Sequence, residues 1–519
     1  MELVDACSEI YLEYIFSYFP ETDGSALAYI ERTIENTNWD SPTTSTDWNN
    51  LAVIDLINAD IEQDLEVKSN FVEYAKQKLE KGFSIDGNLC CAAHYILIQS
   101  MIGESNQANA IALDVLVNMR QEDEYINSVE SGLIFLPSGI RGSCEAELIL
   151  TSTNAYLRNL MLLAEVLRRS QFVFYNQFSI RILRLANQFF PESFNILLCL
   201  GIAELIYNHP EGIVYIKQVY KNHSDNSAAL QAMYLNCRDN NIDNASYWLD
   251  KAQSISKDSE KSLEWEWQSL SVDSQFTYVA FEQDLLLAVE PSFRSIVTSV
   301  LIAQGDWFEY EMEFWRDNIH AHMTVIDVGA NAGVYTFSAA KRVGNTGLVL
   351  TIEPFSQCII YLNETCKINQ FDWVKVCAGA ASDFNGKAKL ALNLRSEFNE
   401  IVVQENEQSF HSYNFEEVDC FTLDSLIDRY GIIRVDFLKI DAEGHELQVL
   451  KGSECLIREF RPTILYENIA RSNKSNLPVA EYLVDLGYKL YHYQPYVKNL
   501  IPIDINNRFD DHLNIIAKF

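Results

Sequence analysis

The stretch VIDVGANAGVYTF, residues 325–337, decides the fold of the second half of this 519-residue chain. A short apolar run ends in Asp327, and Gly329 and Gly333 then bracket a tight turn before a helical pattern begins. A strand that turns so sharply into a helix predicts backbone that approaches a ligand closely at a helix N-terminus. The spacing Asp-x-Gly-x-x-x-Gly differs from the Gly-x-Gly-x-x-Gly of dinucleotide folds, and no Lys-Ser/Thr pair follows, as a P-loop requires.

The pattern around this turn continues to the C-terminal residues. From about residue 324, short apolar strands alternate with helical segments. Such alternation predicts a parallel sheet with helices on both faces. We therefore predict a doubly wound, Rossmann-like α/β domain over residues 324–519. The predicted strands are MTVIDVG, LVLTIEP, WVKVCAG, VDFLKID, PTILYEN, YKLYHY and LNIIAKF, and the predicted helices cover residues 334–342, 356–369, 445–460 and 477–486.

Residues 1–280 follow a different pattern, in which apolar residues recur every three or four positions. This periodicity predicts helices. Similar short stretches at Pro191, Asp225 and Ser259 lie 34 residues apart, a spacing that resembles the tetratricopeptide repeat. We predict an all-α helical-repeat module over 1–280, with an unrelated helical domain as the alternative, and a lead-in or linker segment over 281–323.

Stacked helical pairs form concave surfaces that bind segments of partner proteins. The stretches CAAHYILIQSMIG, residues 91–103, and NQANAIALDVLVNMR, residues 106–120, make one such predicted pair. A peptide is therefore one expected partner of the helical module.

Charge and composition exclude several classes of function. The chain has 39 Lys and Arg against 73 Asp and Glu, a formal net charge of −34. Binding to nucleic acid depends on concentrated positive charge, so neither nucleic acid nor an anionic membrane is an expected partner. The first residues lack a basic signal-peptide region and no stretch of 18 apolar residues occurs, which predicts a cytoplasmic protein. The 11 cysteines are scattered without zinc-site spacing and are expected to be reduced thiols.

An acidic residue follows the second predicted strand of the α/β domain. Glu353 ends LVLTIE and precedes Pro354. A carboxylate at this strand tip is placed to accept hydrogen bonds from a ribose diol. The glycine turn and this acid together fit S-adenosylmethionine, against the alternative of a plain strand–turn–helix that holds no ligand.

Several motifs, in the same order, resemble the FkbM family of S-adenosylmethionine-dependent methyltransferases. They are VIDVGANAGVYTF, IEP, LDSL (423–426), FLKIDAEGHELQVLKG (437–452) and PTILYEN (462–468), preceded by QGDWFEYE (304–311). The resemblance covers about residues 290–519 and does not extend to the helical half. It implies S-adenosylmethionine as the cofactor and S-adenosylhomocysteine as the product.

The resemblance also implies which residues contact the cofactor. Those beside the methionine and ribose would be Asp327, Gly329, Asn331, Ala332 and Gly333, with Glu353 at the ribose hydroxyls. Those beside the adenine would be Ala381, Ser382 and Asp383. The end of the fourth strand would face the transferred methyl group.

Catalytic candidates cluster at that fourth strand end. A carboxylate or a neutral imidazole there can orient or deprotonate an acceptor hydroxyl. We predict this role for Asp441, Glu443, His445 and Glu467. Acids at a helix start also cap the helix, which is the alternative for Asp441, for Glu443 and for the neighbouring Glu446. A surface position without a role is the alternative for His445, and an edge-of-sheet acid without a role is the alternative for Glu467.

A metal ion is a further alternative at these acids. Oxygen-only sets such as Asp441, Glu443 and Glu467 can hold a divalent cation. Their spacing does not decide the question, and a divalent metal is not predicted. Methyl transfer itself depends mainly on positioning an already activated group.

The resulting prediction is a methyltransferase that acts on a hydroxyl of a sugar or natural product, and the family resemblance favours oxygen as the acceptor atom. One alternative is N-methylation of an amide or amine on a peptide held by the helical module. Another is an inactive, cofactor-binding adaptor. The acceptor is accordingly expected to be a small molecule, a glycan or a peptide.

Overall fold

The protein is described by a computed structural model that covers residues 2–20, 24–118, 132–139, 141, 143–240, 244–256, 262–402, 414–470, 474–505, 509 and 512–519. These residues form two compact units. The first comprises Met1–Ala203 with Gln494–Asn499, and the second comprises Glu204–Tyr493 with Leu500–Phe519. The domain bounds drawn from the sequence, at residues 280 and 323, stay a prediction.

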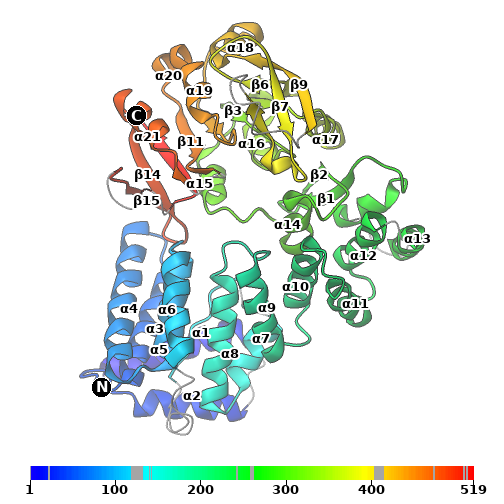
Figure 1. The fold of residues 1–519 in the computed structure, drawn as a ribbon. Coiled ribbons are helices and arrows are strands. Elements are labelled where there is room, and N and C mark those ends of the chain that lie inside the picture. The colour runs from blue at the N-terminus through cyan, green and yellow to red at the C-terminus, as the bar shows by residue number, and fades with distance from the viewer. Residues whose placement is uncertain are drawn as a thin grey trace. The chain divides into compact units, whose positions relative to one another are not determined.

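The first unit is built around helices (Figure 1). Polar residues start several of them: Thr44 and Asp47 form a capping box, and Asn88 and Asn154 accept backbone N–H groups at the starts of their helices. The helices are α1 (Glu2–Tyr18), α2 (Gly24–Asn36), α3 (Ser45–Ile61), α4 (Leu65–Asp86), α5 (Leu89–Met101), α6 (Ser105–Asn118), α7 (Cys144–Thr151), α8 (Ala155–Arg169), α9 (Gln177–Phe189) and the start of α10 (Phe194–Ile206). The predicted pair at 91–103 and 106–120 corresponds to α5 and α6.

Further helices open the second unit. They are α11 (Gly212–Asn222), α12 (Ser227–Asp239), α13 (Ala245–Ser256) and the 3-10 helix η3 (Leu263–Ser269). The prediction that the first half of the chain is helical is confirmed. Pro191 precedes α10 and Asp225 precedes α12, whereas Ser259 lies outside the described residues. The repeat itself therefore stays a prediction.

The lead-in segment contains regular structure. A hairpin of β1 (Thr277–Phe281) and β2 (Leu285–Val289) is followed by α14 (Ile296–Gln304) and α15 (Glu311–Asn318). Trp315 of α15 is fully buried, and its ring packs edge-on against those of Tyr335 and Phe437. These aromatic contacts join the lead-in to the following sheet.

The central sheet has the strand order β15-β14-β16-β11-β10-β3-β4-β5. Its strands are β3 (Thr324–Val328), β4 (Leu348–Glu353), β5 (Val374–Ala378), β10 (Phe437–Ile440), β11 (Thr463–Glu467), β14 (Lys489–Gln494), β15 (Asn499–Pro502) and β16 (Asn514–Lys518). The strands from β11 to β5 pair in parallel, as predicted, whereas β16 is antiparallel to both β11 and β14. The sheet is therefore mixed, because the terminal strands return without a crossover helix.

Alternation along the strands supplies two buried faces. Ile326 and Val328 belong to a core cluster with side chains of α18 (Leu423–Tyr430), α19 (Glu446–Lys451), α20 (Glu454–Phe460) and α21 (Leu477–Asp485). Asp327 points to the other face, where Thr336 of α16 (Val334–Val343) contacts it. Helix α17 (Ser356–Ile368) packs against β4 and β5.

The predicted single helix over 445–460 is wrong, because the structure has two helices, α19 and α20, with Gly452 between them. A Cβ atom on Gly452 would lie 1.9 Å from the carbonyl oxygen of Ser382. The helix is therefore interrupted at Gly452, where the backbone of Ser382 packs closely against it.

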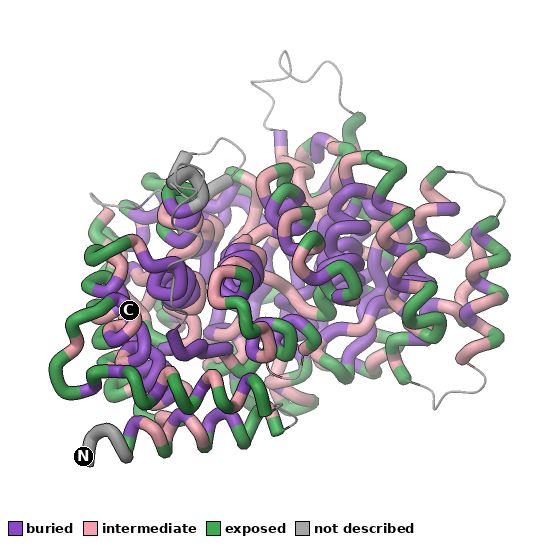
Figure 2. The backbone as a smooth tube through the Cα atoms, turned by 90° about the horizontal axis from the view of Figure 1, so that it is seen from below, coloured by how far each residue is buried: buried purple, intermediate pink, exposed green. Residues whose placement is uncertain are grey.

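A small second sheet, which the sequence analysis does not predict, lies between β5 and β10 in the chain. It has the order β6-β9-β7-β8 and consists of β6 (Ala380–Ala381), β7 (Gly386–Leu392), β8 (Glu400–Val402) and β9 (Asn414–Phe421). A short ladder pairs β12 (Ile469–Ala470) with β13 (Lys474–Ser475). Among the described residues we find no helix with the length and apolar character that a membrane span requires. Buried and exposed residues alternate around the helices (Figure 2).

Candidate active site

The parallel register brings the predicted residues to one edge of the sheet. Asp327 of β3 lies opposite Lys439 of β10 and Thr351 of β4. Beyond this row, β4 ends at Glu353 and β11 at Glu467, and Asp441 directly follows β10. Since the carboxyl ends of parallel strands meet at the same edge, groups far apart in the sequence share one site, which is where α/β sheets bind ligands.

The glycine turn fits tightly against the end of β10. Gly329 has φ +77°, and a Cβ atom there would lie 1.6 Å from the carbonyl oxygen of Asp441. Gly333 has φ +90°, and its Cβ would lie 2.5 Å from the ring of Phe337. Asn331 also has a positive φ, of 48°. Both glycines of the motif are therefore required by backbone conformation and by the absence of space.

Asp327 is 1% exposed, and its carboxylate is only partly hydrogen-bonded. The hydroxyl of Thr336 donates to Oδ2 at 2.6 Å, whereas the buried Oδ1 has no hydrogen-bond partner. Burial raises the pKa of Asp327, and the charge of Lys439 opposes that shift. A buried acceptor without a donor is rare in folded proteins, so this oxygen fits a ligand that carries a donor.

Glu353 connects the second strand tip to the glycine turn. Its Oε2 accepts the backbone N–H of Asn331 at 2.8 Å, and Oε1 accepts that of Phe355 at 2.9 Å. Burial raises the pKa of Glu353 to about 7, although these two hydrogen bonds act in the opposite direction. Each carboxylate oxygen has a second lone pair, so the group can hold the turn and still accept ligand hydroxyls.

The turn residue Ala332 and the residues predicted beside the adenine are mostly buried as well. Ala332 donates its N–H to the side chain of Asn331 at 2.7 Å, and Ala381 belongs to β6. Ser382 donates its N–H to the carbonyl of Phe421 at 2.9 Å, and Asp383 follows it.

His445 is also buried, at 7% exposure, so a surface position for it is wrong. The hydroxyl of Ser382 lies 2.9 Å from its Nε2. Burial lowers the pKa of this imidazole, whereas the charge of Asp383 acts in the opposite direction. A lowered pKa favours the neutral ring. Through Ser382, this ring links the residues after β6 to the start of α19.

Three carboxylates gather where β10 and β11 end. Carboxylate oxygens of Asp441, Glu443 and Glu467 all lie within 4.8 Å of one another. The buried Oε2 of Glu467 has no hydrogen-bond partner. Burial and the charges of Asp441 and Glu443 raise the pKa of Glu467, which favours the protonated form of this carboxyl group. The set has the oxygen chemistry of a divalent cation site, and a proton on Glu467 provides another way to reduce its charge.

Glu446 has a separate, structural role. Its Oε1 accepts the backbone N–H groups of Ala442 and Gly444, each at 3.0 Å, and Oε2 accepts the side-chain amide of Asn476 at 2.8 Å. The capping alternative raised for Glu446 is the one that these contacts fit.

A buried network that the sequence motifs do not predict lies behind Asp441. The ammonium of Lys439 lies 2.9 Å from Oδ2 of Asp441 and 4.7 Å from the ring centre of Tyr335. Tyr335 donates its hydroxyl to Glu309 at 2.6 Å, and Asn514 donates to the same carboxylate at 3.1 Å. Lys439 and Glu309 lie inside the motifs KIDAEGHE and QGDWFEYE, so the signal was present although neither role was recognised.

A comparison with protein families identifies this part of the chain. Residues 327–490 match the methyltransferase FkbM domain. The FkbM domain thus includes the glycine turn, Glu353, the loop after β5 and the three-carboxylate cluster. It covers less than a third of the chain, and the comparison with curated proteins found no match.

Solved structures give partial similarities. The methyltransferase FkbM from Methylobacillus flagellatus is 18% identical with a TM-score of 0.26, and the match spans 38% of this chain and 44% of that protein. A SAM-dependent methyltransferase from Aquifex aeolicus is 19% identical with a TM-score of 0.22, over 40% of this chain and 88% of that one. MamA MSR-1 C2 is 12% identical with a TM-score of 0.27, and the match spans 41% of this chain and 97% of that one.

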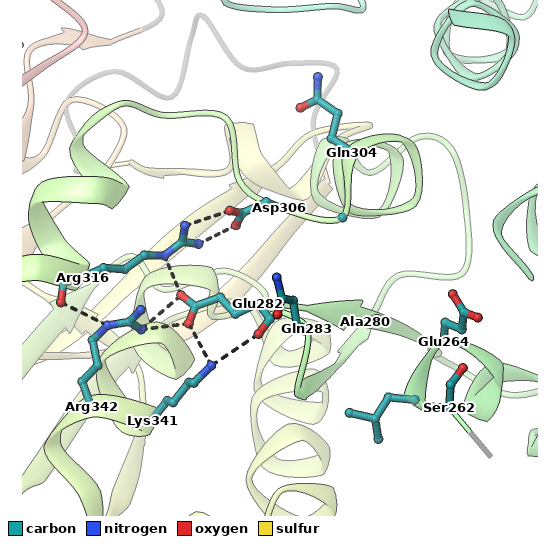
Figure 3. Close-up of a pocket in the computed structure, with 12 residues that line it drawn as sticks. Ser262, Glu264, Ala280, Glu282, Gln283, Gln304, Asp306, Arg316, Lys341 and Arg342 are labelled. Atoms are coloured by element: carbon teal, nitrogen blue, oxygen red, sulfur yellow. Dashed lines mark hydrogen bonds and ion pairs between the residues drawn. The ribbon is translucent and has the colours of Figure 1, made fainter. Parts of the chain in front are cut away.

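A cavity of about 810 Å³ lies at the other end of α16 (Figure 3). Its cations are Arg316, Lys341 and Arg342, and Glu282 pairs with all of them. Arg316 also pairs with Asp306, and Lys341 with Asp284. These cations are neutralised within the protein, and we assign no ligand to this cavity.

Proposed function

We propose that the FkbM domain transfers a methyl group from S-adenosylmethionine to a hydroxyl of a sugar or natural-product acceptor. The observation that carries this proposal is the unpaired, buried Oδ1 of Asp327 beside the glycine turn, in a domain that matches a methyltransferase family. The cofactor carries an ammonium group and ribose hydroxyls, which are the donors that Asp327 and Glu353 can accept.

One set of residues would bind the cofactor, and another would position the acceptor. Gly329, Asn331, Ala332 and Gly333 shape the turn, and Ala381, Ser382 and Asp383 line the adenine side. When bound, S-adenosylmethionine would supply a methyl group that its sulfonium already activates, and S-adenosylhomocysteine would remain as the product. The protein therefore contributes mainly orientation and exclusion of water.

Asp441 is the group we assign to the acceptor hydroxyl. Its carboxylate is partly exposed, whereas Lys439 holds it from the buried side. In this position it can accept the hydroxyl proton while the oxygen attacks the methyl carbon. Glu443 and Glu467 border Asp441, and His445 fixes the neighbouring loop through Ser382.

The first test separates cofactor binding from turnover. Asp327→Asn should weaken S-adenosylmethionine binding about 10–100-fold in calorimetry, because the amide keeps the Thr336 contact but loses the charged acceptor. The exposed Asp428→Asn is the matched control and should leave binding unchanged. Equal affinities of the two variants would contradict the proposed cofactor site.

The second test concerns the acceptor. Methyl-labelled S-adenosylmethionine is incubated with the protein and fractionated lysate, and Asp441→Asn is run beside the unmodified chain. Label in small-molecule or glycan fractions, reduced about 100-fold or more by Asp441→Asn at nearly unchanged cofactor affinity, would support O-methylation. Label in peptide amides would favour the N-methyltransferase alternative, and cofactor binding without any labelled product would favour the inactive adaptor.

A further inference from the structure

An extended segment of the first unit, residues 132–137, has its backbone bound by side chains. The residues Leu133, Ile134, Phe135 and Leu136 are at most 2% exposed, and none belongs to a helix or strand. A buried extended chain usually satisfies its N–H and C=O groups in a sheet. Here no neighbouring strand does so among the described residues, and side chains of three helices supply the partners.

The N–H groups are bound one after another. Leu133 donates to Oδ1 of Asn50 at 2.7 Å, and Ile134 donates to the hydroxyl of Tyr11 at 3.2 Å. Phe135 donates to Nε2 of His94 at 3.0 Å, and Leu136 donates to the hydroxyl of Tyr14 at 2.9 Å. The acceptors come from α1, α3 and α5. We call Tyr11, Tyr14, Asn49, Asn50 and His94 the peptide site.

Three carbonyl groups of the segment are bound by side chains of the same peptide site. Asn49 donates to the carbonyl of Leu133 at 2.9 Å, Tyr11 to that of Ile134 at 3.1 Å, and Tyr14 to that of Leu136 at 2.9 Å. Tyr11 and Tyr14 are three residues apart on one face of α1, and they bind two residues that are two apart on the segment. The helix spacing thus matches the repeat of an extended chain.

The imidazole of His94 is arranged for this contact. Its Nδ1 lies 2.8 Å from Oδ1 of Asn49, which can only accept, so Nδ1 carries the proton and Nε2 is free to accept from Phe135. Burial lowers the pKa of His94 to about 4, which keeps the ring neutral. Asn49 is thereby oriented to donate to Leu133.

Both ends of the segment are fixed as well. A Cβ atom on Gly132 would lie 2.4 Å from Asn49 and 2.5 Å from Asn50, so the chain enters where only glycine fits. Arg141 donates to the carbonyl of Leu136 at 3.0 Å and pairs with Asp60 of α3.

We propose that the peptide site is a recognition site for an extended apolar peptide, and that residues 132–137 occupy it as an internal ligand. The contacts to N–H and C=O groups recognise an extended backbone of any sequence, and the buried side chains select apolar residues. A partner peptide of this kind binds only when the internal segment leaves. This inference rests on the first unit alone and is independent of the proposed methyl transfer.

Hydrogen exchange on the intact chain is the first test. If the segment is a ligand, the amides of residues 133–136 exchange through a local opening at least about tenfold faster than the amides of α3 and α5 that protect the core. Exchange of all these amides at the same rate would show that the segment is an inseparable part of the core and would overturn the proposal.

The second test empties the site. In the full chain, Leu133, Ile134, Phe135 and Leu136 are replaced by alternating Gly and Ser, and a labelled peptide of residues 132–139 is added. We expect binding at least about tenfold tighter than to the unmodified chain. A peptide N-methylated at the Phe135 amide, which cannot donate to His94, should bind about tenfold more weakly.

Two outcomes would contradict the proposal. A folded variant that does not bind the peptide would show that the site does not recognise it, and equal binding of the N-methylated peptide would show that the backbone contacts are not what is recognised. If the variant fails to fold by circular dichroism, the exchange measurement on the intact chain decides.

Discussion

The two units differ in whether the clustered polar groups of each find hydrogen-bond partners within the chain. In the FkbM domain, the polar groups stand at the ends of neighbouring strands, and an acceptor on Asp327 is left without a donor. In the first unit, the polar side chains of the peptide site are buried, and the segment 132–137 satisfies them. The polar groups of the FkbM domain are therefore open to a ligand from outside, whereas those of the peptide site already bind a segment of the chain.

Breaking the FkbM turn should have the largest effect. Gly329→Ala places a Cβ within 1.6 Å of a backbone carbonyl oxygen at φ +77°, and neither backbone can move without displacing β10. We expect the second unit to lose about 4 kcal/mol or more of stability, measured by denaturant unfolding. Gly431→Ala is the matched control: its φ is +63°, but no atom lies within 4 Å of the added Cβ, so the cost should be about 1 kcal/mol. Similar losses for both variants would show that conformation, and not close packing, explains the motif.

A corresponding change in the first unit should cost less. Asn50→Leu removes the acceptor of the buried Leu133 N–H, and we expect a loss of about 1–3 kcal/mol with no change in cofactor binding. Gln77→Leu, an exposed amide of α4 in the same unit, should stay within about 0.5 kcal/mol. A neutral result for Asn50→Leu would mean that water reaches the segment and that the first unit is open as well.

The smallest effect is expected at the three-carboxylate cluster, and it depends on pH. Because the pKa of Glu467 is raised, the folded protein binds more protons than the unfolded chain once the pH exceeds the ordinary value of a glutamate, about 4.3. The group therefore lowers stability increasingly as the pH rises from about 4 to neutral. Glu467→Gln removes this cost, so its melting temperature should exceed that of the unmodified chain by a few degrees at pH 7 and by nothing at pH 4.

The control for this experiment is Glu459→Gln, an exposed glutamate of α20, which should show no pH-dependent gain. Adding millimolar Mg²⁺ to the unmodified chain sharpens the result. A Mg²⁺-dependent rise in melting temperature that Glu467→Gln abolishes would identify a cation site, which is the alternative raised for these acids.

Local sequence was sufficient to predict a feature where the residue type follows from the conformation of its own backbone. Gly329 and Gly333 could be recognised because a strand that turns into a helix needs positive φ, and Glu353 and Asp441 because each ends an apolar run. The helices of the first half followed from periodicity in the same way. The break at Gly452 was missed, because it results from the Ser382 carbonyl, which lies far away in the sequence.

The sequence by itself determined that a glycine turn and several acids stand at the ends of strands, and that the first half is helical. Only the tertiary structure decided which groups meet: that Ser382 contacts His445, that Lys439 holds Asp441, and that Asn50 and His94 bind the backbone of residues 133–136. The physical reason is that conformational preference acts within a few residues of the chain. Hydrogen bonds and desolvation act between groups that only folding brings together.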